Sequence, residues 1–117
     1  MAPRVARLSG VSTFQELRSP HGRGRSGPVR VAFRRPDGAD EGEAVASVGY
    51  TVTRRYGGAV ERNRIRRRLR ACVDSISGDL QAGKYLISTG PSAAELSFDQ
   101  LLLAVSEATA RASETRS

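Results

Sequence analysis

The sequence predicts one α+β domain whose helices cover one face of a small sheet, in the order helix, two strands, helix, strand, helix. Apolar residues alternate with polar residues in short segments, which is the period of a half-buried strand. Apolar residues recur every three to four positions in two longer segments, which is the period of an amphipathic helix. The 117 residues are enough for one core. Together these observations predict a two-layer sandwich.

Residues near the N-terminus are predicted to form a short helix and then a loop. A capping box of Thr13 and Glu16 begins a helix over 13–18, which is anchored by the aromatic ring of Phe14. The stretch 19–28 holds two prolines, three glycines and two arginines, with nothing apolar to bury. We expect it to be a mobile loop whose charge suits a single-stranded partner.

Two antiparallel strands are predicted next. Apolar and polar residues alternate over 29–34, as in a strand with one buried face. The stretch 36–44 is acidic and rich in turn-forming residues. It connects to a second strand over 45–53, where β-branched and aromatic residues surround Gly49.

The second half of the chain is predicted to form a helix, a strand and a helix. A helical stripe begins after Ala59 and consists of Ile65, Leu69, Cys72, Val73 and Ile76. A mostly apolar strand over 84–89 ends before Pro91. Ser97 and Gln100 form a second capping box. The stripe of the helix that follows is Phe98, Leu101, Leu102, Val105 and Ala108. We expect Phe98 and Tyr85 to be core residues.

We expect residues 1–117 to form a single domain, with a flexible N-terminus over 1–10 and a frayed tail over 112–117. The single cysteine, Cys72, excludes an intramolecular disulfide, and the single histidine, His21, leaves no spacing for a zinc site. No apolar run reaches the roughly 20 residues of a membrane span, and no signal peptide is evident. The sequence therefore predicts a soluble, cytoplasmic protein.

Positive charge is concentrated in the segment 54–70, which holds eight arginines and one acid, Glu61. Eight minus one is +7, which equals the formal net charge of the whole chain. The other eleven basic and eleven acidic residues therefore cancel. Charge of one sign on one short element is typical of a surface that binds a polyanion, with nucleic acid first and acidic membrane second.

Helical geometry at about 100° per residue separates these side chains into groups. Opposite the apolar stripe lie Asn63, Arg66, Arg67 and Arg70. Beside the stripe lie Arg62, Arg64 and Arg68. Like charges three or four positions apart repel by a few tenths of a kcal/mol per pair, roughly. We infer that compensating negative charge comes from outside the chain.

No arrangement typical of a protein active site is present. His21 lies in the glycine-rich stretch, and Cys72 belongs to an apolar stripe. The acids of the turn-rich stretch, which have no visible catalytic partner, are Asp37, Asp40, Glu41 and Glu43. Gly57 and Gly58 precede a helix but lack the lysine and hydroxyl of a phosphate-binding loop, so a turn at positive φ is their expected role.

The segment 47–73, SVGYTVTRRYGGAVERNRIRRRLRACV, resembles the signature of the bacterial ribonuclease P protein subunit. The centre of the signature is Arg62, Asn63, Arg64, Ile65, Arg66 and Arg67. VSTFQEL is similar to the N-terminal helix of that family, and KYLISTGPSAAELSFDQL to its third strand and last helix. The resemblance covers most of the chain and implies a left-handed βαβ crossover, an exception to the usual right-handed rule.

The resemblance also implies a function. The protein would be the RNA-binding subunit of a ribonucleoprotein endonuclease that removes the 5′ leader from precursor tRNA. Its partners would be the catalytic RNA, in a 1:1 complex, and the precursor tRNA, with no membrane. Catalysis would belong to the RNA and to magnesium, which is mainly RNA-bound, and no catalytic residue is expected in the protein.

Two sets of site residues follow from the resemblance and from position on the helix. The set expected to contact the catalytic RNA is Arg62, Asn63, Arg64, Arg66, Arg67, Arg68 and Arg70. The set expected to contact the single-stranded leader, in a cleft between the N-terminal helix and the sheet, is Phe14, Arg18, Phe33, Arg54 and Arg55. Arg18 stands where family members often carry a second aromatic, and the stretch 19–28 is richer in glycine and arginine than the family pattern.

Two other functions account for the same charge. A ribosomal or general RNA-binding protein would bind RNA without a catalytic partner. A basic amphipathic helix could instead dock on acidic membrane or on a helix-binding partner, but its apolar stripe would then have to leave the core. The spacing of Phe14 and Phe33 is equally compatible with stacking on bases and with burial against the helices.

Overall fold

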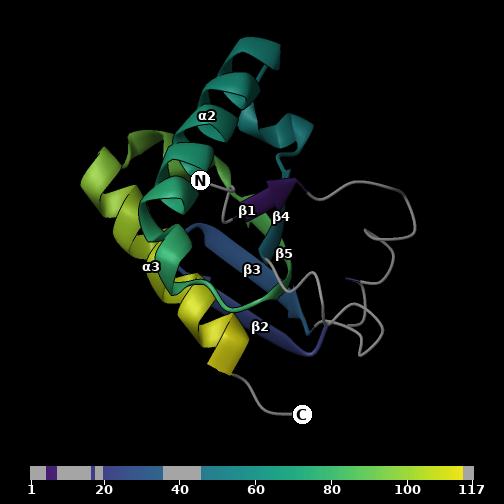
Figure 1. Ribbon diagram of the computed structural model, residues 1–117. Coiled ribbons are helices and arrows are strands. Elements are labelled where there is room, and N and C mark those ends of the chain that lie inside the picture. Colours follow the sequence, from purple (N-terminus) through teal and green to yellow (C-terminus); the bar gives the residue numbers. More distant parts are fainter. Residues whose placement is uncertain (1–4, 8–16, 18–19, 36–45, 115–117) are drawn as a thin grey trace.

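The computed structural model of the protein describes residues 5–7, 17, 20–35 and 46–114. The strands are β1 Val5–Arg7, β2 Gly22–Ser26, β3 Val29–Arg34, β4 Ala46–Thr51 and β5 Gly83–Thr89. The long helices are α2 Ala59–Ile76 and α3 Phe98–Glu114, and the short 3₁₀ helices are η2 Arg54–Tyr56, η3 Ser77–Asp79 and η4 Pro91–Glu95. The two long helices lie against the sheet in a second layer (Figure 1). The predicted α+β two-layer class is confirmed.

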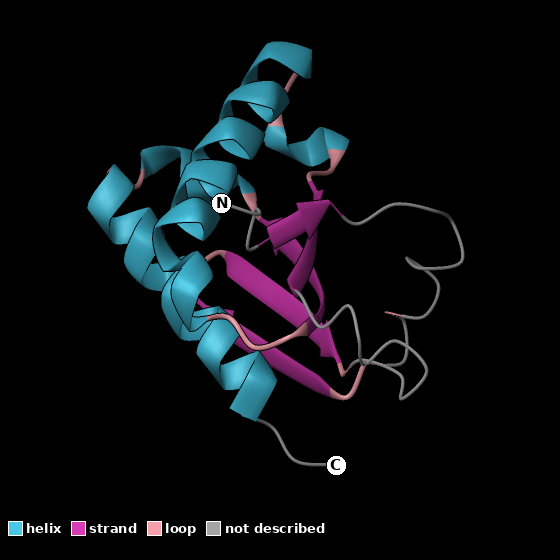
Figure 2. Ribbon diagram, viewed as in Figure 1, coloured by secondary structure: helices cyan, strands magenta, loops and turns pink. Residues whose placement is uncertain are grey.

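The five strands form one mixed sheet in the order β1-β4-β5-β3-β2. β2, β3 and β5 pair antiparallel, whereas β1, β4 and β5 pair parallel (Figure 2). Because β4 and β5 are parallel neighbours, α2 is the crossover of a βαβ unit. The left hand that the family resemblance implies for this crossover stays a prediction.

The core lies between the helices and one face of the sheet. Along β3 the side chains of Val29, Val31 and Phe33 are buried, while Arg30 is exposed, as the alternation predicts. On α2 the predicted stripe is confirmed, because Ile65, Leu69, Cys72 and Val73 are buried, and Ile76 is half-buried. The buried side chains of α3 are Leu101, Ala104, Val105, Ala108, Thr109 and Ala112.

Both long helices begin where local hydrogen bonds satisfy their first turns. The backbone N–H of Gly58 donates to Glu61 Oε1 at 2.8 Å before α2. Before α3 the predicted capping box is present: Ser97 N–H donates to Gln100 Oε1 at 2.9 Å, and Gln100 N–H donates to Ser97 Oγ at 3.1 Å. Gly57 has a φ of 151°, so this turn uses a glycine-specific conformation.

The stretch 19–28 is not the loop that its composition predicts. Five of its residues form β2, which pairs antiparallel with β3. A turn at Gly27, where φ is 56°, connects the two strands into a hairpin. A Cβ on Gly24 would lie 2.0 Å from the carbonyl oxygen of Ala108. Position 24 therefore requires a glycine because α3 packs directly on the strand backbone there, and turn propensity does not reveal that requirement.

Several end assignments also change. The parallel strand β1 occupies 5–7, within the N-terminus that was expected to be flexible. α3 continues to Glu114 and buries Ala112, so the frayed tail does not begin at 112. Phe98 is 41% exposed rather than a core residue, because it occupies the first position of α3, whereas Tyr85 is 1% exposed as expected.

Two predicted segments lie outside the described residues. These are the N-terminal helix over 13–18, of which only Leu17 is described, and the acidic stretch 36–44. In the described part of the chain, neither long helix has a segment apolar enough to cross a membrane.

Candidate nucleic-acid interface

The outward face of α2 carries a shallow hollow surrounded by cations. The hollow has a volume of about 450 Å³ and is lined by Val60, Asn63, Arg66, Arg67 and Arg70. The prediction that Asn63, Arg66, Arg67 and Arg70 share one face of the helix is therefore confirmed. Arg66 Nη1 donates to Asn63 Oδ1 at 3.1 Å, which fixes the amide and one guanidinium relative to each other. Fixed donors around a hollow suit the oxygens of a phosphate backbone.

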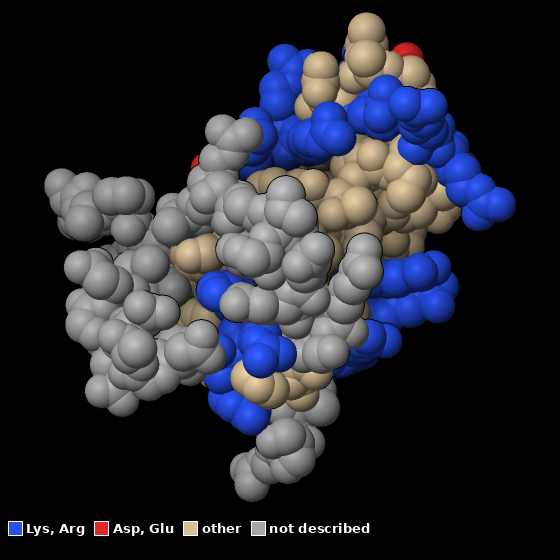
Figure 3. All heavy atoms as spheres, turned by 90° about the vertical axis from the view of Figure 1, so that its right-hand side faces the viewer, with Lys and Arg blue, Asp and Glu red and all other residues tan. Residues whose placement is uncertain are grey.

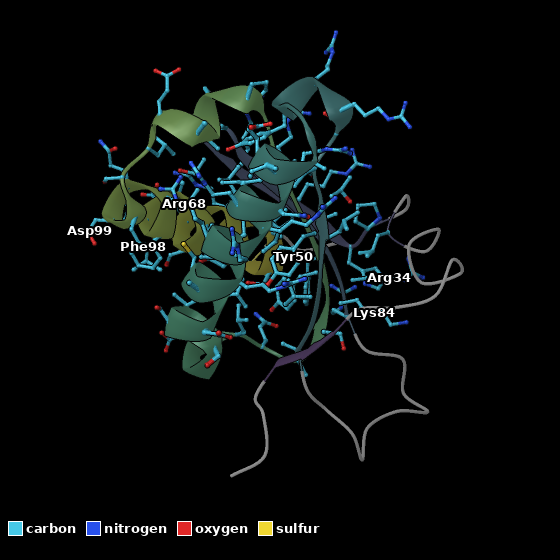
Figure 4. All side chains as sticks on the ribbon, turned by 90° about the horizontal axis from the view of Figure 1, so that it is seen from above. Arg34, Tyr50, Arg68, Lys84, Phe98 and Asp99 are labelled. Atoms are coloured by element: carbon cyan, nitrogen blue, oxygen red, sulfur yellow. The ribbon has the colours of Figure 1, made fainter. Side chains whose placement is uncertain are left out.

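Arg62 and Arg68 flank the buried stripe, as predicted, and both are half-buried. The guanidinium of Arg68 donates to the backbone carbonyls of Ala93, at 3.5 Å, and Leu96, at 2.5 Å. These bonds tie α2 to η4 and to Leu96, the residue that ends it; Figure 4 labels Arg68 on α2. Arg68 was expected to contact RNA, but in this structure its charge holds two secondary-structure elements together.

Arg64 and the two arginines of η2 extend the positive surface beyond the hollow. Arg54, Arg55 and Arg64 are exposed. Burial raises the pKa of Tyr56, while the charges of Arg68 and Arg64 lower it, which places this ring in the field of both arginines. Figure 3 shows Lys and Arg side chains gathered at the level where α2 begins, and a second group lower on the same face.

A second positive surface lies on the face of the sheet that the two long helices leave uncovered. Arg23 and Arg25 from β2 and Arg30 from β3 are exposed there. Arg34 and Lys84 lie farther along the sheet, on the side away from α2 (Figure 4). We call these five residues the sheet cations.

Strand pairing places sheet cations of like charge directly opposite one another. Arg25 pairs with Arg30 across β2 and β3, and Arg34 pairs with Lys84 across β3 and β5. Like charges in such positions destabilise a sheet. The Arg25–Arg30 pair therefore gives this surface a like-charge conflict of the kind found on α2.

A hollow of about 370 Å³ opens on this surface. Its lining combines three of the five sheet cations with apolar and small residues: Leu17, Arg23, Gly24, Arg25, Arg30, Val31, Ala32, Leu86 and Ser88. Ala32 and Leu86 are paired across β3 and β5, and Leu17 is buried at 4% exposure. An apolar floor between arginines suits a chain of bases on a charged backbone.

Among the residues expected to contact the leader, Phe33 is buried, and Phe14 and Arg18 are not among the described residues. Phe33 is 2% exposed, and its ring lies in the core with its centroid 4.8 Å from that of Tyr85. This placement corrects the expectation that Phe33 lines an open cleft, because its side chain points to the opposite face from Arg30 and Arg34. Phe14 and Arg18 lie outside the described residues.

Sequence reasoning placed Arg23 and Arg25 in a mobile loop whose charge suits a single-stranded partner, and it assigned Arg30, Arg34 and Lys84 to no site. One signal was available, because Arg30 and Arg34 alternate with the apolar residues of a predicted strand and so had to share its open face. Sequence reasoning did not join β2 to that face, because its glycines are typical of a loop, whereas Gly24 lies where α3 packs on the strand.

The surroundings of His21 and Cys72 fit the structural roles that the sequence predicts for them. The Arg35 N–H donates to His21 Nδ1 at 2.8 Å, so the imidazole belongs to a strand-end contact. Cys72 is fully buried, and burial raises the pKa of its thiol. Within the described ranges, no three side chains of His, Cys, Asp or Glu come together to hold a metal ion.

The membrane alternative conflicts with the packing of α2. Ile65, Leu69 and Cys72 are each 0% exposed, so the apolar stripe that would enter a bilayer is already used in the core. The arginine face and the sheet cations define a small α+β protein with two polycationic surfaces, a class suited to nucleic acid.

Comparison with known proteins identifies the family. The family model for Ribonuclease P matches residues 2–113, and the chain belongs to this family. Among curated relatives, the ribonuclease P protein component of Bartonella quintana is 40% identical over 69% of this chain and 65% of its own length. That of Gluconacetobacter diazotrophicus is 41% identical over 62% of this chain and 60% of its own length. That of Brucella melitensis is 32% identical over 97% and 84%.

The chain matches the first two of these relatives over slightly less than two thirds of their length.

Solved structures share the fold. The RNase P protein from Staphylococcus aureus superposes with a TM-score of 0.77 at 15% identity, covering 95% of this chain and 97% of that one. The RNase P protein from Thermotoga maritima gives 0.72 at 17% identity, covering 85% and 90%.

Proposed function

We propose that the protein is the RNA-binding subunit of ribonuclease P and assists a catalytic RNA in removing the 5′ leader from precursor tRNA. The observation that carries this proposal is the arginine face of α2 in a chain of the Ribonuclease P family. Curated relatives bear the name ribonuclease P protein component. The protein acts as part of the enzyme, by binding, and the RNA with its magnesium supplies the chemistry.

In this proposal the two positive surfaces have different partners. The arginine face of α2, with Asn63, Arg66, Arg67 and Arg70 around its hollow, contacts the catalytic RNA in a 1:1 complex. Arg62 and Arg64 extend that contact. Exposed guanidinium groups form bidentate bonds with phosphate, and each such contact releases counterions.

The single-stranded leader of the precursor tRNA lies along the open face of the sheet. The sheet cations contact its phosphates, while Ala32 and Leu86 contact its bases. Arg54 and Arg55, which are exposed in η2 after β4, extend this path toward α2.

The buried, free thiol of Cys72 is compatible with the reducing cytoplasm, where we place the protein.

Reconstitution tests the proposal. The protein is mixed with its cognate catalytic RNA and a precursor tRNA at a magnesium concentration too low for the RNA alone, and cleavage at the 5′ end is measured. We expect the protein to restore cleavage. Binding to the RNA without any gain in cleavage would favour a general RNA-binding protein instead and would remove the proposal.

A further inference from the structure

Tyr50 lies at the junction of β4 and α2. It is half-buried, and it belongs to the same face of β4 as the buried Ala46 and Val48. The Cζ atom of Arg70 lies over the face of the Tyr50 ring, 5.9 Å from its centroid. Figure 4 shows Tyr50 beside α2. The spacing is within the roughly 6 Å over which a guanidinium is attracted by the electron-rich face of an aromatic ring.

Arg70 also lines the hollow on the arginine face of α2. One face of the Arg70 guanidinium thus lies against the ring of Tyr50, a residue of β4, while the Arg70 side chain remains exposed to solvent. Arg66 in the same hollow is restrained differently, through its hydrogen bond to Asn63 at 3.1 Å. A restrained arginine loses less side-chain entropy when it contacts phosphate than one that is free in solution.

The Tyr50 ring stays neutral under ordinary conditions. Burial raises the pKa of its hydroxyl to about 12, although the charge of Arg70 lowers it and the charge of Asp74 raises it. The attraction to Arg70 is consequently that of a ring face for a cation, and it does not require an ionised hydroxyl. A phenylalanine would preserve it, whereas an aliphatic side chain of similar bulk would not.

We propose that Tyr50 is a positioning residue that orients Arg70 toward a phosphate of the RNA bound at the arginine face. The proposal rests on the proposed RNA-binding function and adds to it a residue that does not itself touch the RNA.

The test is a pair of double-mutant cycles on the full-length protein, with affinity for the cognate catalytic RNA measured at several salt concentrations. One cycle combines Tyr50→Leu with Arg70→Ala. The matched control cycle combines Tyr50→Leu with Arg67→Ala, because Arg67 lines the same hollow without lying on the ring. Thermal unfolding of each variant gives the folded fraction, and Tyr50→Phe provides the conservative replacement.

We expect Tyr50→Leu to weaken RNA binding about two- to fivefold and Tyr50→Phe to leave it near wild type. Tyr50→Leu changes no charge, yet it should lower the magnitude of the salt slope by up to about one, since Arg70 then no longer reaches its phosphate. The effect should vanish when Arg70 is already alanine and persist when Arg67 is alanine.

Equal effects of Tyr50→Leu in both cycles would overturn the proposal, because the ring would then act only through general stability. A wild-type protein that does not bind the RNA would instead remove the proposed function itself. If Tyr50→Phe weakened binding as much as Tyr50→Leu, the hydroxyl rather than the ring face would be responsible, and the proposal would again be wrong.

Discussion

The arginine face of α2 and the open face of the sheet are both strongly positive, but they are built in different ways. On α2 the polar lining of the hollow comes from one continuous run of eight residues, 63–70. On the sheet, the cations come from β2, β3 and β5, and they meet only because these strands pair. A charged helix face is thus a local property of the sequence, whereas a charged sheet face is a property of the fold.

The two surfaces also differ in what lies between the cations. The α2 hollow contains an amide, Asn63, and one exposed apolar side chain, Val60. The sheet hollow has an apolar floor of Ala32 and Leu86, with Leu17 at its edge. The first suits the backbone of a folded RNA, and the second suits unpaired bases, which are attracted by apolar as well as charged groups.

The largest expected effect separates core from surface on β3. Phe33→Ala should lower the free energy of unfolding by about 3–5 kcal/mol, because it removes a buried ring that packs on Tyr85. Urea denaturation measures the loss, with Leu103→Ala, at a residue 61% exposed, as the control expected to change little. A stable Phe33→Ala variant with weakened leader binding would return Phe33 to the leader site.

The next effect tests whether α3 holds the sheet surface in place. Gly24→Ala would bring a Cβ within 2.0 Å of the Ala108 carbonyl oxygen. We expect it to cost about 1–3 kcal/mol of stability and to disturb the hairpin that carries Arg23 and Arg25. At Gly90 no heavy atom lies within 4 Å of an added Cβ, so Gly90→Ala is the matched control for denaturation. Equal costs for the two variants would contradict the close packing.

The burial of Tyr85 on the core face of the sheet predicts that the free energy of unfolding falls at high pH. Burial raises the pKa of Tyr85 from 10.0 to about 12, so the folded state favours the neutral ring. Its contribution to stability is complete below pH 10 and is lost as the pH rises from 10 through 12. We expect Tyr85→Phe to reduce the fall in unfolding free energy by up to about 1.4 kcal/mol per pH unit in this range. An identical pH dependence in the variant would contradict the burial.

The smallest effects compare charge with geometry inside the α2 hollow. Arg67→Ala should lower the magnitude of the salt slope of RNA binding by about one, as expected for one lost phosphate contact. Asn63→Ala should weaken binding with little change in that slope, because the amide is neutral and acts by holding Arg66. Titrations with the catalytic RNA at four or more salt concentrations measure both. Unchanged slope and affinity in Arg67→Ala would mean that this side chain is a bystander.

What could be predicted from sequence follows the same division. The α2 stripe, its arginine face and the α3 capping box depend on residues within a few positions, and each is confirmed. β2 was not recognised, because Gly24 allows a long-range contact with α3 rather than a turn. The alternation over 29–34 puts Phe33 on the buried face of β3. Sequence reasoning nevertheless leaves its role open between stacking on bases and burial, and the family resemblance then assigns it to the leader.

The assignment of the two surfaces to two RNAs is tested most directly by leader length. The affinity of the reconstituted holoenzyme is measured for precursor tRNAs with a long leader and with a single leader nucleotide, using wild type, the sheet variant Arg25→Ala/Arg30→Ala and the helix variant Arg67→Ala. With the catalytic RNA saturated, the sheet variant should lose the affinity gained from the long leader, and the helix variant should retain it. Loss of that gain in the helix variant alone would contradict the assignment.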